Sequence, residues 1–487
     1  MWMNNFLKNI VVFSILAILV STNIGYASDE VENTSYAKKE YGRVQYKTKE
    51  FKSSLTQIDE KFNNLNINSA YEELNKLIFD YENNDYYLMI LADKATNLGF
   101  FDLANIAFSK FSDIEISEFN ANNTRNLFFP KSVMNKEDIV FLAEAYSNIQ
   151  YNDRKNEAIT DVNTKFTNKE NDYADYILAL GYLELDDIEN AQKHIQKALT
   201  KNPNNLNYKI LQSKIVASQK KKNKKALKIV KNIKSEKVSY YPIKKQIDAN
   251  EQYVMYKLEK KPFMKDYHLG YYYYLLGEDN KSLRVLQSAI SKNNSKNALL
   301  YSLMSRVYVR NREYDKAKVV ATKAYDYNLS NVNALLSLGD ISFEENKYKQ
   351  ALKYYKQAAK SNSSATEINL KLADTYAKLN NTKTSNDMYK KILKKDENAY
   401  QSYYQLALTN PNIELSYLKK AVAINPHYSD AWIDLSRIMI ENGNYSMAKK
   451  YLENAYYIDG NDFRYYYYQS LLIKKLEELN RAEKRSL

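Results

Sequence analysis

A pattern of small and apolar residues that returns about every 34 residues is the feature that most constrains the fold of this chain. Its clearest copy runs from Trp432 to Ala455. In this copy an apolar stripe with helical spacing ends at Gly443, where a residue without Cβ allows positive φ, and a second stripe follows from Ala448. Neither helix can bury its stripe alone, so the pair has to stack against copies of itself. The sequence therefore predicts a solenoid of helix pairs.

One small residue near the start of each second helix marks the register of this repeat. A small side chain is needed there because the backbones of neighbouring helices approach closely. The marker residues are Ala70, Ala104, Ala191, Ala226, Ser282, Ala317, Ala351, Ser385 and Ala448. Most successive markers lie 34 or 35 residues apart, whereas chance apolar periodicity drifts out of phase over such a length. The longer intervals predict an insertion near residues 111–138, an unpaired helix at about Ile243–Glu259 and a shortened copy near Pro411.

The motif positions resemble those of the tetratricopeptide repeat. One copy consists of Leu178-Ala179, Tyr182, Ala191, Ile195, Ala198 and Pro203, and another of Leu338-Gly339, Tyr348, Ala351, Tyr355 and Ala358. The resemblance covers roughly residues 55–460. It implies an all-α fold, in which about ten or eleven antiparallel helix pairs form a right-handed superhelix with a C-terminal capping helix. It also implies a concave face, lined by the first helix of each pair, that usually binds an extended peptide or a partner helix.

The same pattern divides the chain into segments. The two arrays are expected to flank an irregular connector, and each end of the chain departs from the repeat. The predicted segments are a signal peptide at 1–27, a polar linker at 28–50, an N-terminal array at 51–239, a Lys-rich helical connector at 240–265, a second array at 266–462, and a capping helix with a tail at 463–487.

The first 27 residues have the composition of a secretory signal peptide. Lys8 precedes an apolar run from Ile10 to Val20, and the small residues Gly25 and Ala27 follow it. The run is short for a membrane span, which needs about 20 apolar residues. We therefore expect cleavage after Ala27 and an exported protein, periplasmic, extracellular or in the cell envelope. The alternative is an uncleaved anchor. No later apolar run is long enough to cross a membrane.

Several classes of chemistry are excluded by composition. The chain has no Cys, which rules out disulfides, thiolate zinc sites and a cysteine nucleophile. Its nine glycines do not have the spacing of a phosphate-binding loop. His194, His268 and His427 fall in different repeats, and solenoid contacts are mostly between neighbours, so a metal site or a triad is not expected. We predict a non-catalytic protein without a cofactor or a bound metal.

Aromatic residues mark one candidate binding surface. If Leu269 and Gly270 are the packing pair of a first helix, then Tyr267, Tyr271 and Tyr274 lie on one helical face on the concave side. Arg306 and Arg310 occupy equivalent places one repeat later. Tyr and Arg are enriched at binding hot spots, which favours a groove for a peptide or a partner helix. The alternative is that these tyrosines reflect the general abundance of Tyr, of which the chain has 46.

A second candidate surface is basic. The formal net charge is +13, and Lys220, Lys221, Lys222, Lys224 and Lys225 stand together. Such a cluster attracts acidic protein, anionic polysaccharide or lipid headgroups, or it is simply a solvated helix face. Nucleic acid is disfavoured because an exported chain seldom meets it.

The sequence thus predicts a protein–protein interaction scaffold of the cell envelope or extracellular space, whose protein or peptide partner is acidic. One alternative is a structural envelope component that binds an anionic cell-wall or capsule polymer through the basic region. The other is a membrane-anchored or cytosolic regulator that retains residues 1–27.

Overall fold

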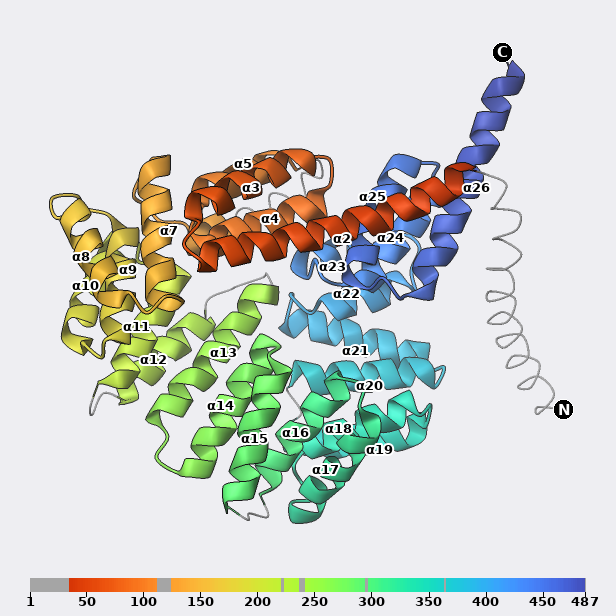
Figure 1. The fold of residues 1–487 in the computed structure, drawn as a ribbon. Helices are drawn as coiled ribbons and strands as arrows, with labels where there is room; N and C mark the ends of the chain where they lie inside the picture. Colours follow the sequence, from red (N-terminus) through yellow and green to blue (C-terminus); the bar gives the residue numbers. More distant parts are fainter. Residues whose placement is uncertain are drawn as a thin grey trace. The chain divides into compact units, whose positions relative to one another are not determined.

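The computed structural model describes residues 35–111, 124–219, 223–235, 241–293, 297–362 and 365–486. These ranges are helical throughout, with turns and short loops but no strand, as predicted (Figure 1). The predicted signal peptide lies outside the described residues, as do Lys220, Lys221 and Lys222. None of the described helices is both long enough and apolar enough to cross a membrane.

The chain forms two compact units, one from residues up to Glu60 together with Trp432–Leu487, and one from Lys61–Ala431. We call them the terminal unit and the central unit. The helices of the terminal unit are α2 (Ser35–Asn63, to Glu60), α24 (Ser429–Glu441, from Trp432), α25 (Tyr445–Ile458) and α26 (Phe463–Ser486). The first half of the central unit contains α3 (Ile67–Asp80), α4 (Asp85–Leu98), α5 (Phe101–Ser109), α7 (Lys136–Gln150), α8 (Lys155–Phe166), α9 (Asp172–Glu184), α10 (Ile188–Lys201), α11 (Leu206–Ser218), α12 (Asn223–Ser235) and α13 (Tyr241–Leu258).

The second half of the central unit is the most regular part of the chain. Its first helices are α14 (Pro262–Leu276), α16 (Ala298–Arg310), α18 (Val332–Glu344), α20 (Thr366–Lys378) and α22 (Tyr400–Ala407). Its second helices are α15 (Asp279–Asn293), α17 (Tyr314–Tyr327), α19 (Tyr348–Ser361), α21 (Thr382–Lys395) and α23 (Glu414–Ile424). The short α22 and the turn with Pro411 form the shortened copy that the sequence predicts. The segment expected as an unpaired helix is α13, but it packs closely along α14, where the rings of Tyr253 and Tyr272 meet with centroids 5.5 Å apart.

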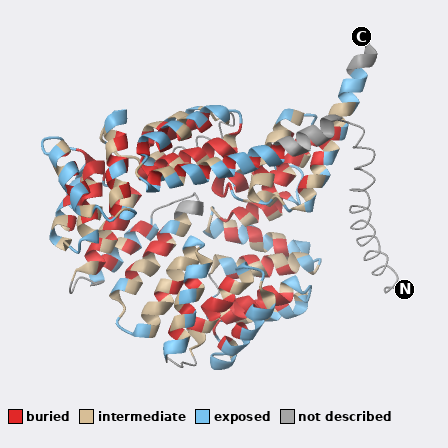
Figure 2. Ribbon diagram, viewed as in Figure 1, coloured by how far each residue is buried: buried red, intermediate tan, exposed pale blue. Residues whose placement is uncertain are grey.

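Every marker residue of the repeat register is at most 1% exposed, which confirms the register. Figure 2 shows that buried and exposed residues alternate along most of the helices, as expected for helices that each bury one face. The packing pair Leu338-Gly339 shows why a small side chain is required. A Cβ built on Gly339 would lie only 2.3 Å from Cε1 of Tyr355, a ring on the second helix of the same pair. Ala351 is fully buried in the cluster that also contains Leu336 and Tyr355.

The insertion near residues 111–138 is held by polar residues of the neighbouring repeat. The Nδ2 group of Asn205 donates to the backbone oxygen of Phe128 at 3.0 Å. The carboxylate of Asp172 accepts from the backbone N–H groups of Lys131, at 2.9 Å, and Ser132, at 2.8 Å. After the insertion, α7 and α8 form a pair with Ala158 buried between them and their neighbours, a copy that the marker series skips.

The predicted polar linker at 28–50 differs from the structure, because α2 is helical from Ser35. The sequence analysis discounted this stretch because its apolar residues are sparse. Val44 and Thr48 nevertheless continue the stripe of Phe51 and Leu55 at spacings of four, three and four, and all four residues are buried. A stripe this thin becomes a helix only when another part of the chain covers it.

The central unit also contains contacts between segments far apart in the sequence. The hydroxyl of Tyr86 lies 2.8 Å from Nδ1 of His427, and their rings meet edge to face. Lys244 Nζ pairs with Asp396 at 3.2 Å. A solenoid is expected to form contacts mostly between neighbouring repeats. This unit also forms contacts between repeats that are distant in the sequence.

Candidate binding groove

The three tyrosines of the predicted groove lie together on α14. The ring centroids of Tyr267 and Tyr271 are 5.9 Å apart, and those of Tyr271 and Tyr274 are also 5.9 Å apart. All three rings are half-buried against a cluster that includes Leu303 and Met304 of α16. Burial raises the pKa of the Tyr271 phenol well above its ordinary value, so this side chain is a neutral hydroxyl at any physiological pH.

One position of the first helices recurs along the groove in successive repeats. Tyr271, Arg306, Asp340 and Asp374 follow one another at intervals of 35, 34 and 34 residues. The position carries an aromatic ring on α14, a cation on α16 and carboxylates on α18 and α20. The predicted binding face is therefore not uniform, since this position changes from neutral to positive and then to negative along the repeats.

Arg306 and Asp340 are the centre of a buried charge network. An Arg306 Nη atom lies 3.0 Å from Asp340 Oδ2, and Lys371 Nζ lies 2.8 Å from Asp340 Oδ1. The hydroxyl of Tyr355 donates to Asp340 Oδ1 at 2.6 Å. Burial alone would raise the pKa of Asp340, but Lys371 and Arg306 outweigh it and hold the pKa below its usual value. The carboxylate therefore stays ionised inside the protein.

Glu367 is the exposed member of this network. It pairs with the second Nη atom of Arg306, whose side chain is only 13% exposed, whereas that of Glu367 is 49% exposed. Burial opposes the charge of Arg306, yet Glu367 and Asp340 together raise its pKa above the ordinary value. A buried guanidinium thus presents one edge to a carboxylate that solvent can reach.

Arg310, the other predicted cation of the groove, forms its contacts with residues of this chain. Its Nε atom donates to Asp279 at 3.0 Å, and an Nη atom donates to the backbone oxygen of Tyr274 at 2.7 Å. Its guanidinium also lies 3.9 Å from the centroid of the Tyr274 ring. The predicted row of Tyr beside Arg therefore exists, but at Tyr274 and Arg310 the two side chains already contact each other.

The described part of the basic cluster lies on α12. Lys224 and Lys225 are exposed, as are Lys228 and Lys231 further along the helix. Ala226, between them, is buried, so the lysines form the outer face of this helix. Within the described residues, none of these four lysines lies at ion-pair distance from a carboxylate.

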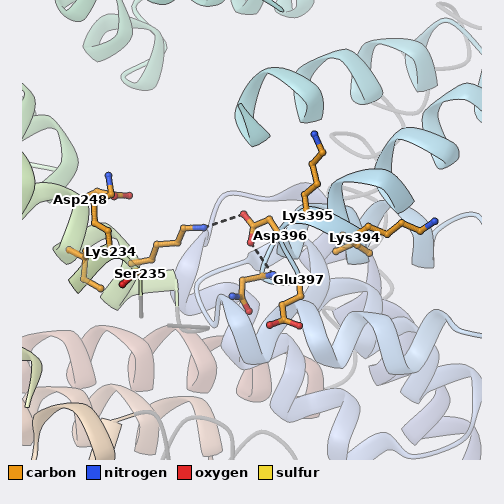
Figure 3. A pocket seen from close by; sticks show the side chains of 11 residues that line it. Lys234, Ser235, Asp248, Lys394, Lys395, Asp396 and Glu397 are labelled. Carbon is orange, nitrogen blue, oxygen red and sulfur yellow. Dashed lines mark hydrogen bonds and ion pairs between the residues drawn. The ribbon is translucent and has the colours of Figure 1, made fainter. Parts of the chain in front are cut away.

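A cavity of about 520 Å³ separates the α12–α13 corner from the end of α21 (Figure 3). Its wall contains both lysines and carboxylates, and two of the lysines form ion pairs. Lys244 contacts Asp396, and Lys234 contacts Glu251 at 2.6 Å and Asp248 at 3.4 Å. The cavity is consequently not a site of one charge sign, and the sequence analysis did not foresee it.

The three histidines occupy separate environments, as predicted. His194 lies 2.7 Å from Asp175, and His268 lies 2.9 Å from Gln252 through Nδ1. His427 contacts Tyr86. Over the described ranges, no group of three or more His, Asp or Glu side chains has the arrangement of a metal site.

The sequence analysis did not identify the charge network formed by Arg306 with Asp340, Tyr355, Lys371 and Glu367. A signal for part of this network was present, since Asp340 and Asp374 are 34 residues apart and so are Tyr355 and Tyr389. In both repeats the tyrosine of the second helix donates to the aspartate of the first. Nothing in the sequence indicates that Glu367 faces Arg306, because these residues are separated by nearly two repeats.

Comparison with known proteins agrees with this architecture. Models of the tetratricopeptide repeat match residues 303–366, 342–410 and 415–472. A TPR repeat-containing protein of Methanocaldococcus jannaschii is 25% identical over 223 residues, which cover 44% of this chain and 36% of that protein. The match thus spans only about a third of the length of this relative.

Several solved structures resemble the chain at low sequence identity. YrrB, described as a TPR protein with an unusual peptide-binding site, is 18% identical with a TM-score of 0.27, over 38% of this chain and 97% of that one. The APC/C hetero-tetramer Cut9–Hcn1 is 10% identical with a TM-score of 0.41, over 85% of this chain and 95% of that one. PilF of Pseudomonas aeruginosa is 15% identical with a TM-score of 0.35, over 43% and 97%. The protein is an all-α solenoid, and its residues 303–410 and 415–472 match the tetratricopeptide repeat.

Proposed function

We propose that the protein is a non-catalytic scaffold that binds a peptide with an acidic side chain in the groove lined by α14, α16, α18 and α20. The observation that carries this proposal is the pairing of buried Arg306 with exposed Glu367. A carboxylate of the partner can take the place of Glu367 on the guanidinium without any change in the buried half of the network. The half-buried rings of Tyr267 and Tyr271 supply apolar contact area beside it.

The exchange has a favourable electrostatic basis. Arg306 is already dehydrated and positioned by Asp340, so an incoming carboxylate gains a charge-assisted hydrogen bond without ordering a flexible side chain. Glu367 loses its partner but is half-exposed, so water solvates it when it swings away. The net attraction of a basic chain adds to the rate of encounter with an acidic partner.

The test is the capture of partners by the purified chain from its own cellular extract. Tyr271→Ala with Tyr274→Ala should leave helix content unchanged by circular dichroism and abolish capture of the main partner. Glu367→Gln should instead strengthen capture by about tenfold, because it removes the competing carboxylate. Tyr151→Ala with Tyr327→Ala, which changes two exposed tyrosines elsewhere, is the matched control. Unchanged capture by the α14 double variant would refute the groove.

A second candidate function uses the outer face of α12, with an anionic cell-wall or capsule polymer as the partner. Its support is the row of exposed lysines at Lys224, Lys225, Lys228 and Lys231. Replacement of these four by Gln should weaken polymer binding most at 0.01 M salt, where the Debye length is about 30 Å. Equal polymer binding by the wild-type and the substituted chain at low salt would show that these lysines are only a solvated helix face without a binding role.

We further propose that the scaffold is exported and acts in the cell envelope or outside the cell. The support is the composition of residues 1–27. N-terminal sequencing of the protein recovered from its host should give a chain that begins at or near Ser28. A cytosolic chain that still begins at Met1 would exclude export.

A further inference from the structure

The terminal unit brings together two ends of the chain through α2. Val44, Thr48, Phe51 and Leu55 form one buried stripe along this helix. Their spacings of four, three and four are those of an amphipathic helix that lies against other helices. The residues that receive the stripe are about 400 positions later in the sequence, on α25 and α26.

The end of α25 is one point of attachment. The rings of Phe51 and Tyr457 meet edge to face, with centroids 5.7 Å apart. Lys52 Nζ donates to the backbone oxygen of Tyr457 at 2.9 Å and lies 4.6 Å from the centroid of its ring. The last carbonyl groups of a helix lack partners within the helix and carry partial negative charge, so an ammonium group is well placed there. α2 thus caps α25 as a ligand would.

The fit is incomplete at the other point of attachment. Val44 borders a cavity of about 40 Å³ together with Leu452 of α25 and Leu472 of α26. The same cavity is lined by Gln469, which is 6% exposed. Its Oε1 atom has no hydrogen-bond partner among the described residues. Burial of an unpaired polar atom is unfavourable, and Val44, the α2 residue that lines this cavity, offers only methyl groups.

We propose that the face formed by α25 and α26 is a binding site for an amphipathic helix, and that α2 is the ligand which this chain supplies for itself. The preferred external ligand is a helix with the same stripe, a hydroxyl donor in place of Val44 and a lysine in the place of Lys52. Such a helix pairs with Gln469 and displaces α2. This site shares no residue with the surface proposed on α14–α20, so either can be refuted without the other.

The first experiment measures binding of a fluorescent peptide of residues 41–60 to the full-length chain. Phe51→Asp in the chain should release α2, so this variant should bind the peptide about tenfold more tightly than the wild-type chain does. A Val44→Thr peptide should bind the variant still more tightly, whereas a Phe51→Asp peptide should bind neither chain. Equal binding by the two chains, or no binding by a folded Phe51→Asp chain, would overturn the proposal.

A second experiment decides the matter if the Phe51→Asp chain loses its helix content. Buried Val→Thr changes normally destabilise because the hydroxyl is left unpaired. Here Gln469 Oε1 is available to accept, so Val44→Thr should slow amide exchange over residues 44–58 severalfold. Val44→Ala should enlarge the cavity and speed exchange over the same residues. Identical exchange in Val44→Thr and Val44→Ala would show that the face does not recognise this position.

Discussion

Asp340 shows how much one side chain can organise in a repeat protein. Its two oxygens accept from Tyr355 and contact Arg306 and Lys371, which belong to three different helices. Its pKa is low only because those cations outweigh the effect of burial. Removal of either cation would leave the buried charges only partly balanced, so the network contributes to the stability of the fold as well as to the proposed binding surface.

Ala351 provides a direct test of packing at this scale. It is fully buried between Leu336 and Tyr355, so Ala351→Trp should overpack the core and lower the free energy of unfolding by roughly 1–3 kcal/mol or more. Faster hydrogen exchange should appear first at residues 335–375, since solenoid coupling is strongest between neighbours. Lys349→Trp, on the exposed side of α19, should have little effect. Unchanged exchange in that region would contradict the register.

The turns between paired helices reveal a shared backbone requirement at the scale of elements. In many copies the first or second residue after the first helix has positive φ, and most of these copies do not use glycine. The residues are Gly99, Asp186, Gly277, Arg312, Asn346, Asn380 and Gly443, with φ between 59° and 83°. Asn and Asp tolerate this conformation better than other residues with a Cβ, which explains how so few glycines serve so many turns.

Two substitutions at this one turn position should have opposite signs. A Cβ on Gly277 would meet no atom within 4 Å, so Gly277→Ala tests backbone conformation alone and should cost about 1 kcal/mol. Arg312 has φ 60° and therefore already carries the strain of a side chain in this conformation. Arg312→Gly removes the strain but makes the unfolded chain more flexible, so the free energy of unfolding should rise by only about several tenths of a kcal/mol. Urea unfolding of both variants measures the difference. The same sign for both would exclude this explanation.

The contact of Tyr86 with His427 matters at the scale of the whole central unit. Burial lowers the pKa of His427, and the nearby charge of Lys245 lowers it further, so the folded unit favours the neutral imidazole. The unfolded chain takes up a proton near the ordinary value of about 6.5. As the pH falls below this value, the unfolded state binds more protons and the free energy of unfolding decreases.

We therefore expect the unfolding midpoint of the protein to drop between pH 7 and pH 5. His427→Asn should reduce this drop, whereas Tyr86→Phe should lower the midpoint at both pH values by a similar amount. His268, whose pKa burial also lowers, contributes in the same direction and accounts for part of the remaining slope. An undiminished slope in the His427→Asn chain would show that this contact does not govern the acid response.

The sequence by itself determined the class of fold, the register and most irregularities. The small markers, the shortened pair at Pro411 and the capping α26 are all local or periodic features. Packing between neighbouring repeats obeys the same period of about 34 residues, so one copy predicts the next. The clustering of Tyr267, Tyr271 and Tyr274 on one face followed from helical spacing for the same reason.

Only the tertiary structure shows which side chains and helices from distant parts of the sequence contact each other, because the repeat period does not determine these contacts. The sequence placed Arg306 and Arg310 near the tyrosines but not in their ion pairs with Glu367 and Asp279. It treated the first half of α2 as a linker because the helices that bury its stripe lie about 400 residues away. A contact between distant segments depends on how small rotations per repeat accumulate, and no single repeat records that sum.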